Sequence, residues 1–402
     1  MTTRRILVVS YHALPRVTPG SLRVAWMSEQ LAARGWDVRI VTSVANPTVP
    51  PGVRVISTAR AAASNPAPRA TRLRTLWNDL AIPDRFVGWT PALTAALSDA
   101  LNQESVDVVL STSPPHSTHL ALAWVRRSRR FRWIADFRDP WTAPTRYPRA
   151  AAVESIQRWL EGTVVHACNE IIANTPGNRA ALLRAFPRLR EAAVHVLPNG
   201  FDDGMLERAA EPALDDADIT YVGEIYPGMV DRFAAALRML AATAPGVAPS
   251  LSLYGEVDPR EWKKLEAAGL AACVRRHGKV SHEESLRVMR RARSLLLLLP
   301  DRPSWATCVP SKLYPYLASG RPVLALVPDG DAARIVRDTG AGEALTDPDP
   351  AATARGIESF LRAAHAPEAA RGRRDDAIHG YAVSSLADRL DAILSALAER
   401  PQ

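Results

Sequence analysis

The sequence contains little cysteine, little lysine and no long apolar run, and each scarcity narrows the choice of protein class. Its 3 cysteines are Cys168, Cys273 and Cys308. They lie far apart and form no C-x-x-C pair, so neither a disulfide framework nor a zinc site is indicated. A reducing compartment fits this usage, and we predict a cytoplasmic protein.

Long apolar segments are also missing. No stretch approaches the roughly 18 apolar residues of a membrane-spanning helix. The apolar run at residues 6–9 is too short for the core of a signal peptide. One alternative stays open: residues 122–133 (L-A-W-V-R-R-S-R-R-F-R-W) are basic with aromatics and would suit a weak contact with a membrane surface, although such a run is more often a solvated helix end.

Lysine is nearly absent, and this bears on the formal net charge of +8. Of the 50 basic residues, the only lysines are Lys263, Lys264, Lys279 and Lys312. The arginines are scattered and interleaved with acids, which is not the footprint of a phosphate-backbone binder. Coding-sequence bias explains the composition at least as well, and we expect no nucleic-acid partner.

The chain is long enough for two domains. With 402 residues it exceeds one ordinary core, and two domains of about 180 to 200 residues are expected. Residues 5–9 read as a buried strand, residues 10–20 as a loop rich in proline and glycine, and the helical pattern from Ser21 ends at Gly35 before a second strand at 38–41. This βαβ pattern predicts a doubly wound parallel sheet whose loops bind ligands at the carboxyl edge.

Two polar clusters follow later strands of the first half. The turn S-P-P-H-S at residues 113–117 would carry His116, or His119, to the carboxyl edge of the sheet, where a histidine can donate to a sugar hydroxyl or accept a proton. The alternative is a capping or core histidine. The next strand, at 133–135, leads into Asp136 and Arg138. These two residues form either an internal ion pair or a site for a sugar or polar acceptor.

The second half repeats the pattern. The turn P-N-G-F-D at 198–202 marks a domain boundary, and strands are predicted at 219–222 and 251–254, ending at Gly223 and at Gly255-Glu256. The stretch 309–327 reads as helix, tight stop at Gly320 and buried strand. In front of this helix, Pro310, Ser311 and Lys312 offer a capping hydroxyl and a cation, which would suit a diphosphate.

Three strings in the sequence resemble a known family. They are D-F-R-D-P-W, P-N-G-F-D and P-S-K-L-Y-P-Y-L-A-S-G-R-P-V-L. Together they resemble GT-B glycosyltransferases of the family 4-like group. The resemblance implies two Rossmann-like α/β domains facing across a cleft, with residues 1–200 on the acceptor side and 201–380 binding the nucleotide sugar. A terminal helix in 381–402 would cross back to the first domain.

The resemblance also implies an activity and its residues. We expect a retaining, metal-independent, hexosyltransferase-type enzyme that uses a nucleoside diphosphate sugar as co-substrate and has no other cofactor. The acceptor would be a small molecule, a polysaccharide or a lipid-linked molecule, in carbohydrate or secondary-metabolite biosynthesis. The expected catalytic residues are His116, Asp136 and Arg138. The expected donor-binding residues are Gly20, Gly223, Glu256, Pro310, Ser311 and Lys312.

The sequence departs from the family pattern in two places. Pro315 stands where the family has its ribose-binding glutamate, and Glu224 stands where many members have a phosphate-binding arginine. Arg232 is a candidate replacement for that arginine, and Arg302 a weaker helper. These departures keep two alternatives open. One is a GT-B enzyme with altered chemistry, such as a sugar-nucleotide epimerase or a non-standard transferase, and the other is a degenerate partner of another transferase.

Overall fold

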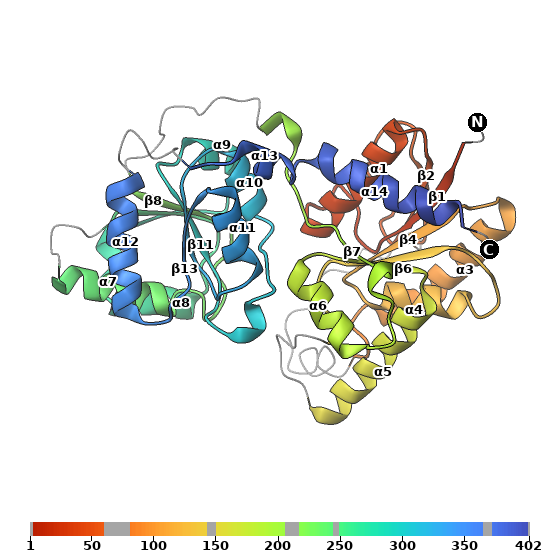
Figure 1. Cartoon of the computed structure of the whole chain (residues 1–402), viewed down its shortest axis with the longest axis horizontal. Helices are drawn as coiled ribbons and strands as arrows, with labels where there is room; N and C mark the ends of the chain where they lie inside the picture. Colours follow the sequence, from red (N-terminus) through yellow and green to blue (C-terminus); the bar gives the residue numbers. More distant parts are fainter. Residues whose placement is uncertain are drawn as a thin grey trace. The chain divides into compact units, whose positions relative to one another are not determined.

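A computed structural model describes residues 3–59, 81–142, 150–205, 217–243, 249–364 and 372–400. The chain forms two compact units (Figure 1). The first combines Met1–Pro198 with Ser384–Gln402, and the second is Asn199–Val383. The carboxyl terminus therefore belongs to the same unit as the amino terminus.

The first unit is built on a seven-stranded parallel sheet with the order β3-β2-β1-β4-β5-β6-β7. Its strands are β1 (Arg5–Val9), β2 (Asp37–Thr42), β3 (Arg54–Ser57), β4 (Val108–Ser113), β5 (Trp133–Phe137), β6 (Glu170–Ala173) and β7 (Val194–Val196). The strand order reverses between β1 and β4. Sheets of this kind bind ligands beyond the carboxyl ends of the strands at that switch point.

Helices cover both faces of this sheet. They are α1 (Pro19–Ala33), α3 (Thr90–Gln103), α4 (Ser117–Val125), α5 (Ala151–Ala167), α6 (Pro176–Ala185) and α14 (Val383–Ala398). The cores on the two faces differ: α1 and α14 contribute to one, and α3 to α6 contribute to the other. Figure 1 shows α14 lying beside α1. Four leucines of α14 are buried in that core, namely Leu386, Leu390, Leu394 and Leu397.

The second unit is built on a six-stranded parallel sheet with the order β10-β9-β8-β11-β12-β13. Its strands are β8 (Ile219–Val222), β9 (Leu251–Tyr254), β10 (Val274–Gly278), β11 (Leu295–Leu298), β12 (Val323–Leu326) and β13 (Gly342–Leu345). The order reverses between β8 and β11. The predicted α/β class with parallel sheets is therefore confirmed in both halves of the chain.

The helices of the second unit also fall on two faces. They are α7 (Asp231–Thr243), α8 (Pro259–Ala267), α9 (His282–Arg291), α10 (Leu313–Ala318), α11 (Asp331–Thr339), α12 (Pro350–Ala364) and α13 (Asp375–His379). Side chains of α7, α8 and α12 share one core, and side chains of α9, α10, α11 and α13 share the other. Among the helices in the described ranges, none is both long and apolar enough to cross a bilayer.

Three predicted boundaries in the first unit were wrong. Helix α1 begins at Pro19 behind a capping box formed by Thr18 and Ser21, so Gly20 lies inside the first helical turn and not in a loop. Strand β5 continues to Phe137, so Asp136 lies on the strand. Strand β3 lies in the segment 45–75, which is rich in proline, alanine, arginine and serine and shows little periodicity, a composition that predicts an irregular connection. Residues 60–75 of that segment are outside the described residues.

One boundary in the second unit was also wrong. Lys312, not Ser311, is the residue that precedes α10, and no side chain caps this helix. The prediction that the Ser311 hydroxyl caps this helix was therefore wrong. Pro315 occupies the third position of α10. A proline is tolerated there because the first-turn N–H groups have no partner within the helix.

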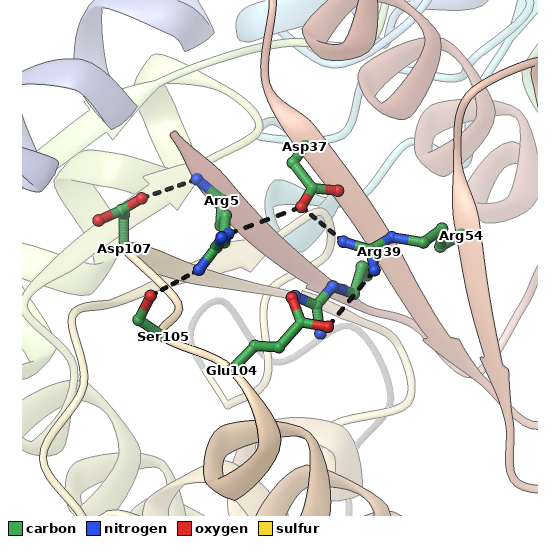
Figure 2. Close-up of polar contacts among 7 residues, drawn as sticks. All are labelled: Arg5, Asp37, Arg39, Arg54, Glu104, Ser105 and Asp107. Carbon is green, nitrogen blue, oxygen red and sulfur yellow. Dashed lines mark hydrogen bonds and ion pairs between the residues drawn. The ribbon is translucent and has the colours of Figure 1, made fainter. Parts of the chain in front are cut away.

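The amino edge of the first sheet is held by a network of charges (Figure 2). Asp37 accepts from Arg54 at 2.5 Å and lies 3.8 Å from Arg5. Glu104 pairs with Arg39 and lies 3.4 Å from Arg54. Two further residues, Ser105 and Asp107, bind Arg5. Arginine and carboxylate are thus matched at this edge, which faces away from the switch point.

Candidate functional site

His116 lies at the carboxyl edge of the first sheet, where β4 leads into α4. Its ring stacks on the indole of Trp141 with the centroids 4.7 Å apart and the planes within 5° of parallel. Trp141 donates its Nε1–H to Gln157 of α5 at 2.6 Å, and Gln157 donates to the carbonyl of Pro83 at 2.8 Å. These contacts fix the plane of the half-buried imidazole. The role of His116 stays a prediction.

His119 lies one turn further along α4 and is fully buried. Its Nδ1 is 2.8 Å from Ser111 Oγ, and its ring centroid is 4.6 Å from that of Phe137. Burial lowers the pKa of His119 to about 3, although Asp136 opposes part of the shift. His119 is therefore a neutral core histidine, which is the alternative that the sequence left open.

Asp136 forms an internal ion pair, but with a partner that the sequence did not indicate. Arg23 of α1 donates to both of its carboxylate oxygens at 2.9 Å, and Thr112 donates to Oδ2 at 2.8 Å. Arg23 also donates to the carbonyls of Leu197 and Pro198 after β7. The pair is buried, and it ties α1 to β5 and to the end of β7. A direct ligand contact by Asp136 stays a prediction.

Arg138 and Gly20 lie against each other, although the sequence placed them in different roles. A Cβ built on Gly20 would lie 2.6 Å from Arg138 Nη1, so a side chain at position 20 would displace the guanidinium. Arg138 donates to Thr112 Oγ1 at 3.2 Å and to the carbonyl of Pro114 at 2.9 Å. Burial lowers the pKa of this arginine, while Asp136 and Asp139 raise it. A mostly buried cation thus touches the first turn of α1.

Sequence reasoning missed His12, which follows β1 at the same edge. Its ring lies 5.1 Å from that of Tyr11 and 6.0 Å from that of Phe86. Burial, together with Arg138, Arg16 and Arg85, lowers the pKa of His12 to about 4, so the ring is neutral at physiological pH. Its position directly after a buried strand was a usable signal, because the same argument selected His116.

Lys312 occupies the switch point of the second sheet. Its Nζ donates to Tyr221 Oη at 2.6 Å and lies 3.9 Å from the centroid of that ring. A Cβ on Gly223 would lie 2.9 Å from Lys312 Cε and closer still to Nζ. Among the residues that the structure describes, no carboxylate ion pair is formed by Lys312. Burial lowers its pKa to about 7, and Glu224 opposes part of the shift.

The structure brings Gly223 and Lys312 together, and Gly255 lies against Gly223. Donor binding by these residues stays a prediction. Gly223 has φ +124° and Gly255 has φ +133°, which side chains rarely adopt, and a Cβ on Gly255 would overlap the carbonyl of Gly223. The backbone therefore passes close to Lys312 at the ends of β8 and β9. Tyr221, which contacts the ammonium, was not identified from the sequence.

Glu256, Ser311 and Pro310, which were also predicted to bind the donor, make fewer contacts with other residues than Lys312 does. Glu256 and Ser311 are exposed, and within the described part of the chain their side chains form no hydrogen bond. The carbonyl of Glu256 accepts from the N–H of Ile225 at 2.9 Å. The carbonyl of Pro310 accepts from Leu313 at 3.0 Å. Their contact with a donor stays a prediction.

Arg232 does not lie beside Lys312. Its guanidinium donates to the carbonyl of Leu345 at 2.7 Å and to Thr353 Oγ1 at 3.0 Å, which holds it at β13 and α12. Glu224, at the position of the missing arginine, is exposed and accepts from Tyr226 Oη at 2.5 Å. Lys312 is therefore the cation that contacts Gly223.

Both halves of the chain match models of glycosyltransferase families. Residues 20–200 match the glycosyl transferase 4-like domain, and residues 216–363 match glycosyl transferases group 1. The chain belongs to the family 4-like GT-B glycosyltransferases. A search of curated proteins returns no match.

Solved structures share the fold of this glycosyltransferase at low identity. Sucrose-phosphate synthase from Thermosynechococcus elongatus has a TM-score of 0.69 and 17% identity, with 98% of this chain and 99% of that chain covered. HepE from Anabaena, in complex with UDP and glucose, has a TM-score of 0.64 and 12% identity over 98% and 100%. The UDP-GlcNAc 2-epimerase from Methanocaldococcus jannaschii has a TM-score of 0.56 and 14% identity over 98% and 99%. At these identities the likeness shows the GT-B fold, which the sequence predicted.

Proposed function

We propose that this glycosyltransferase moves a sugar from a nucleoside diphosphate sugar to its acceptor with retention of configuration and without a metal ion. Lys312 carries the proposal. It is an ammonium group at the switch point of the second sheet, it contacts the glycine turn after β8, and it forms no carboxylate ion pair among the described residues. An anionic ligand would supply the missing countercharge.

The chemistry of sugar transfer matches this arrangement. The leaving diphosphate gains negative charge as the glycosidic bond of the donor breaks, and a fixed cation in a partly desolvated site stabilises that charge without reorganising. Lys312 is held by the hydroxyl of Tyr221, which in turn donates to the carbonyl of Glu224 at 2.8 Å. Lys312 would thus supply the charge that a metal ion supplies in other transferases.

A uridine nucleotide sugar is the first donor to test. The HepE structure contains UDP and glucose, and HepE shares the fold over the whole chain. In the first unit we assign His116 and Arg138 to the orientation of sugar or acceptor. We assign Asp136 a positioning role, because its oxygens are occupied by Arg23 and Thr112.

The test is a panel of nucleotide sugars incubated with the full chain, followed by thermal shift and by slow hydrolysis of the donor. We expect at least one donor to raise the melting temperature and to be hydrolysed, and Lys312→Met to lose both effects. Magnesium chelation should leave hydrolysis unchanged, and NMR of the released or transferred sugar should show the anomeric configuration of the donor. A chain that responds to no nucleotide sugar, or a product of inverted configuration, would contradict the proposal.

A further inference from the structure

Two asparagines at the turn between β6 and α6 carry buried amide groups that the protein itself does not use. Asn174 directly follows β6, and Asn178 is the third residue of α6. Only 5% of the surface of Asn174 and 6% of that of Asn178 is exposed. Within the described part of the chain, Asn174 Oδ1 and both Oδ1 and Nδ2 of Asn178 have no hydrogen-bond partner. One turn of the backbone therefore carries three buried polar atoms whose hydrogen bonds are not made.

The turn does not need these amides for its own structure. Thr175 caps α6 by accepting from the N–H of Asn178 at 3.1 Å, and its carbonyl accepts from the N–H of Arg179 at 3.0 Å. Pro176, the first residue of the helix, has no N–H to satisfy. A leucine would fill the space of each asparagine without the cost of burying an unpaired polar group. The unpaired atoms are therefore available to a bound molecule.

The two asparagines lie at the carboxyl edge of the first sheet. At this edge Ala173, the last residue of β6, is in register with Phe137 of β5, and Arg138 follows Phe137. Asn174 therefore lies at the same level as Arg138 on the neighbouring strand. Helix α6 packs against β6 and β7, and its first turn brings Asn178 to the same edge. Ligands of such sheets bind beyond the carboxyl ends of the strands.

The unpaired atoms determine which chemical group fits this turn. A ligand has to donate to the side-chain oxygens of Asn174 and Asn178 and to accept from the side-chain nitrogen of Asn178. A carboxylate or a phosphate dianion only accepts, and an ammonium group only donates, so each would leave some of these atoms unpaired. A hydroxyl group both donates and accepts. Two neighbouring hydroxyls of a sugar or a cyclitol would therefore satisfy all three atoms.

We propose that Asn174 and Asn178 bind two neighbouring hydroxyl groups of the acceptor, which therefore contains a sugar or a cyclitol. The inference rests on the proposed function and names the class of its acceptor. Because the amides are removed from water, a hydroxyl that meets them supplies hydrogen bonds that are otherwise lost, and an acceptor without that hydroxyl leaves them unpaired. The two asparagines thus select the acceptor by its pattern of hydroxyl groups.

Hydroxyl groups occur both in the acceptor and in the sugar of the donor, and the experiment separates these two sources. The full chain, with the nucleotide sugar that it hydrolyses, is offered a panel of sugars and cyclitols, and primary alcohols as acceptors that lack a diol. For the best acceptor, analogues that lack one hydroxyl each are compared by kcat/KM. The variants are Asn174→Leu and Asn178→Leu, and Asn102→Leu, at an exposed position of α3, is the matched control. The melting temperature and the affinity for the nucleotide sugar are measured for each variant.

We expect a diol to be the preferred acceptor and each variant to lower its kcat/KM by about tenfold. The melting temperature should stay the same or rise, because leucine removes an unpaired buried amide. Removal of the bound hydroxyl should lower kcat/KM in the wild type and have little further effect in the variant, since both changes remove the same contact. Affinity for the nucleotide sugar should stay within about twofold of wild type, and Asn102→Leu should behave as the wild type.

Four other results would overturn the inference. A lower melting temperature with unchanged kcat/KM would mean that the amides hold a structural water molecule. Additive losses from the variant and the missing hydroxyl would mean that the hydroxyl binds elsewhere, and weaker donor binding would assign the amides to the sugar of the donor. An enzyme that hydrolyses its donor but transfers to no diol, or prefers alcohols without one, would also contradict the inference. A wild type that binds no nucleotide sugar would instead refute the proposed function.

Discussion

The ammonium of Lys312 is in an unusual environment for a lysine. It is removed from much of the solvent, its only described polar partner is a tyrosine hydroxyl, and burial lowers its pKa to about 7. Burial disfavours the charged form, so in the unliganded protein the pKa of Lys312 lies close to neutral pH. A bound diphosphate would raise its pKa again by favouring the ammonium.

This coupling predicts a pH dependence of donor binding. Above about pH 7 the free enzyme loses the proton of Lys312, and binding must restore it, so affinity should fall as the pH rises, by at most about tenfold per pH unit. The measurement is the Kd of a nucleotide sugar, whose diphosphate charge is constant in this range, at pH 6.5 to 9. Calorimetry in buffers of different ionisation enthalpy should detect proton uptake.

Lys312→Arg and Lys312→Met provide the comparison. The arginine stays charged across this range and should remove the slope, whereas methionine should give weak binding at every pH. A wild-type Kd that is constant from pH 6.5 to 9 would show that Lys312 does not pair with the diphosphate.

A second prediction concerns Gly223. Gly223→Ala adds a methyl group that overlaps Lys312 Nζ at a backbone φ of +124°. We expect donor affinity to fall by more than about tenfold and the free energy of unfolding to fall by about 1 kcal/mol or more. Gly228→Ala is the matched control, because Gly228 also has positive φ, +88°, but nothing lies within 4 Å of its Cβ position. Equal donor affinity in the two variants would contradict the assignment.

At the scale of residues, the sequence identified candidates within motifs that resemble the family, and it missed contacts between residues that are distant in the chain. Lys312 was found because it sits in a long string that resembles the family. Arg23 was missed because it lies 113 residues from Asp136, and nothing local marks a helical arginine as the partner of a strand aspartate. The arginines around His12 were missed for the same reason.

At the scale of elements, α5 supports the loop after β5. Gln157 binds the indole of Trp141, which stacks on His116, and Glu161 accepts from Thr142. Burial raises the pKa of Glu161 to about 7. The helix thus holds two successive residues of the loop, and it acts on His116 without touching it.

Gln157→Leu tests this support. The change leaves the Trp141 N–H and the Pro83 carbonyl without their partner, so we expect a loss of about 1 to 3 kcal/mol in the free energy of unfolding. The turnover number for transfer should fall by about tenfold while UDP affinity is retained, because a displaced Trp141 no longer fixes the His116 ring. Arg158→Gln, at the exposed neighbouring position, is the control. Loss of stability without loss of turnover would limit Gln157 to a structural role.

Elements with continuous apolar runs were the easiest to predict. Strands β1, β8 and β9 have the predicted bounds, because buried parallel strands are mostly apolar. The first residues of helices were harder to predict from the sequence. The capping box at Thr18 was not recognised, and Ser311 was taken for a cap, because a hydroxyl before a helix caps it only when its backbone has the right conformation.

At the scale of the whole molecule, α14 completes the core of the first unit. Its four buried leucines pack with strands and with α1 of that unit. Leu390→Ala should therefore lower the free energy of unfolding of the first unit by about 2 to 5 kcal/mol, because it opens a cavity in a close-packed core.

The readout is urea unfolding followed by the tryptophan fluorescence of the first unit, with UDP affinity measured below the transition. Ala392→Ser, on the exposed side of α14, should leave unfolding unchanged. An unaltered unfolding curve for Leu390→Ala would mean that α14 is not part of that core in solution.

The two-part organisation could be predicted because it depends on chain length, on a repeated strand and helix pattern, and on a turn at 198–202. The right-handed crossover rule then restricts each half to a small set of strand orders. The sequence could not predict where charged side chains such as Lys312 lie without an oppositely charged partner among the described residues. Their positions depend on which loops the folded sheet brings together.

Since Met1–Pro198 and Ser384–Gln402 fold as one body, Asn199–Val383 is in topological terms an insertion. The inserted part is one contiguous stretch of chain, whereas the host part can be made without the insertion only by joining two distant pieces of chain with a linker. Fluorophores or affinity tags at the two ends of the polypeptide would both report on the host. A probe of the inserted part therefore has to be placed within the chain, at a surface position between Asn199 and Val383.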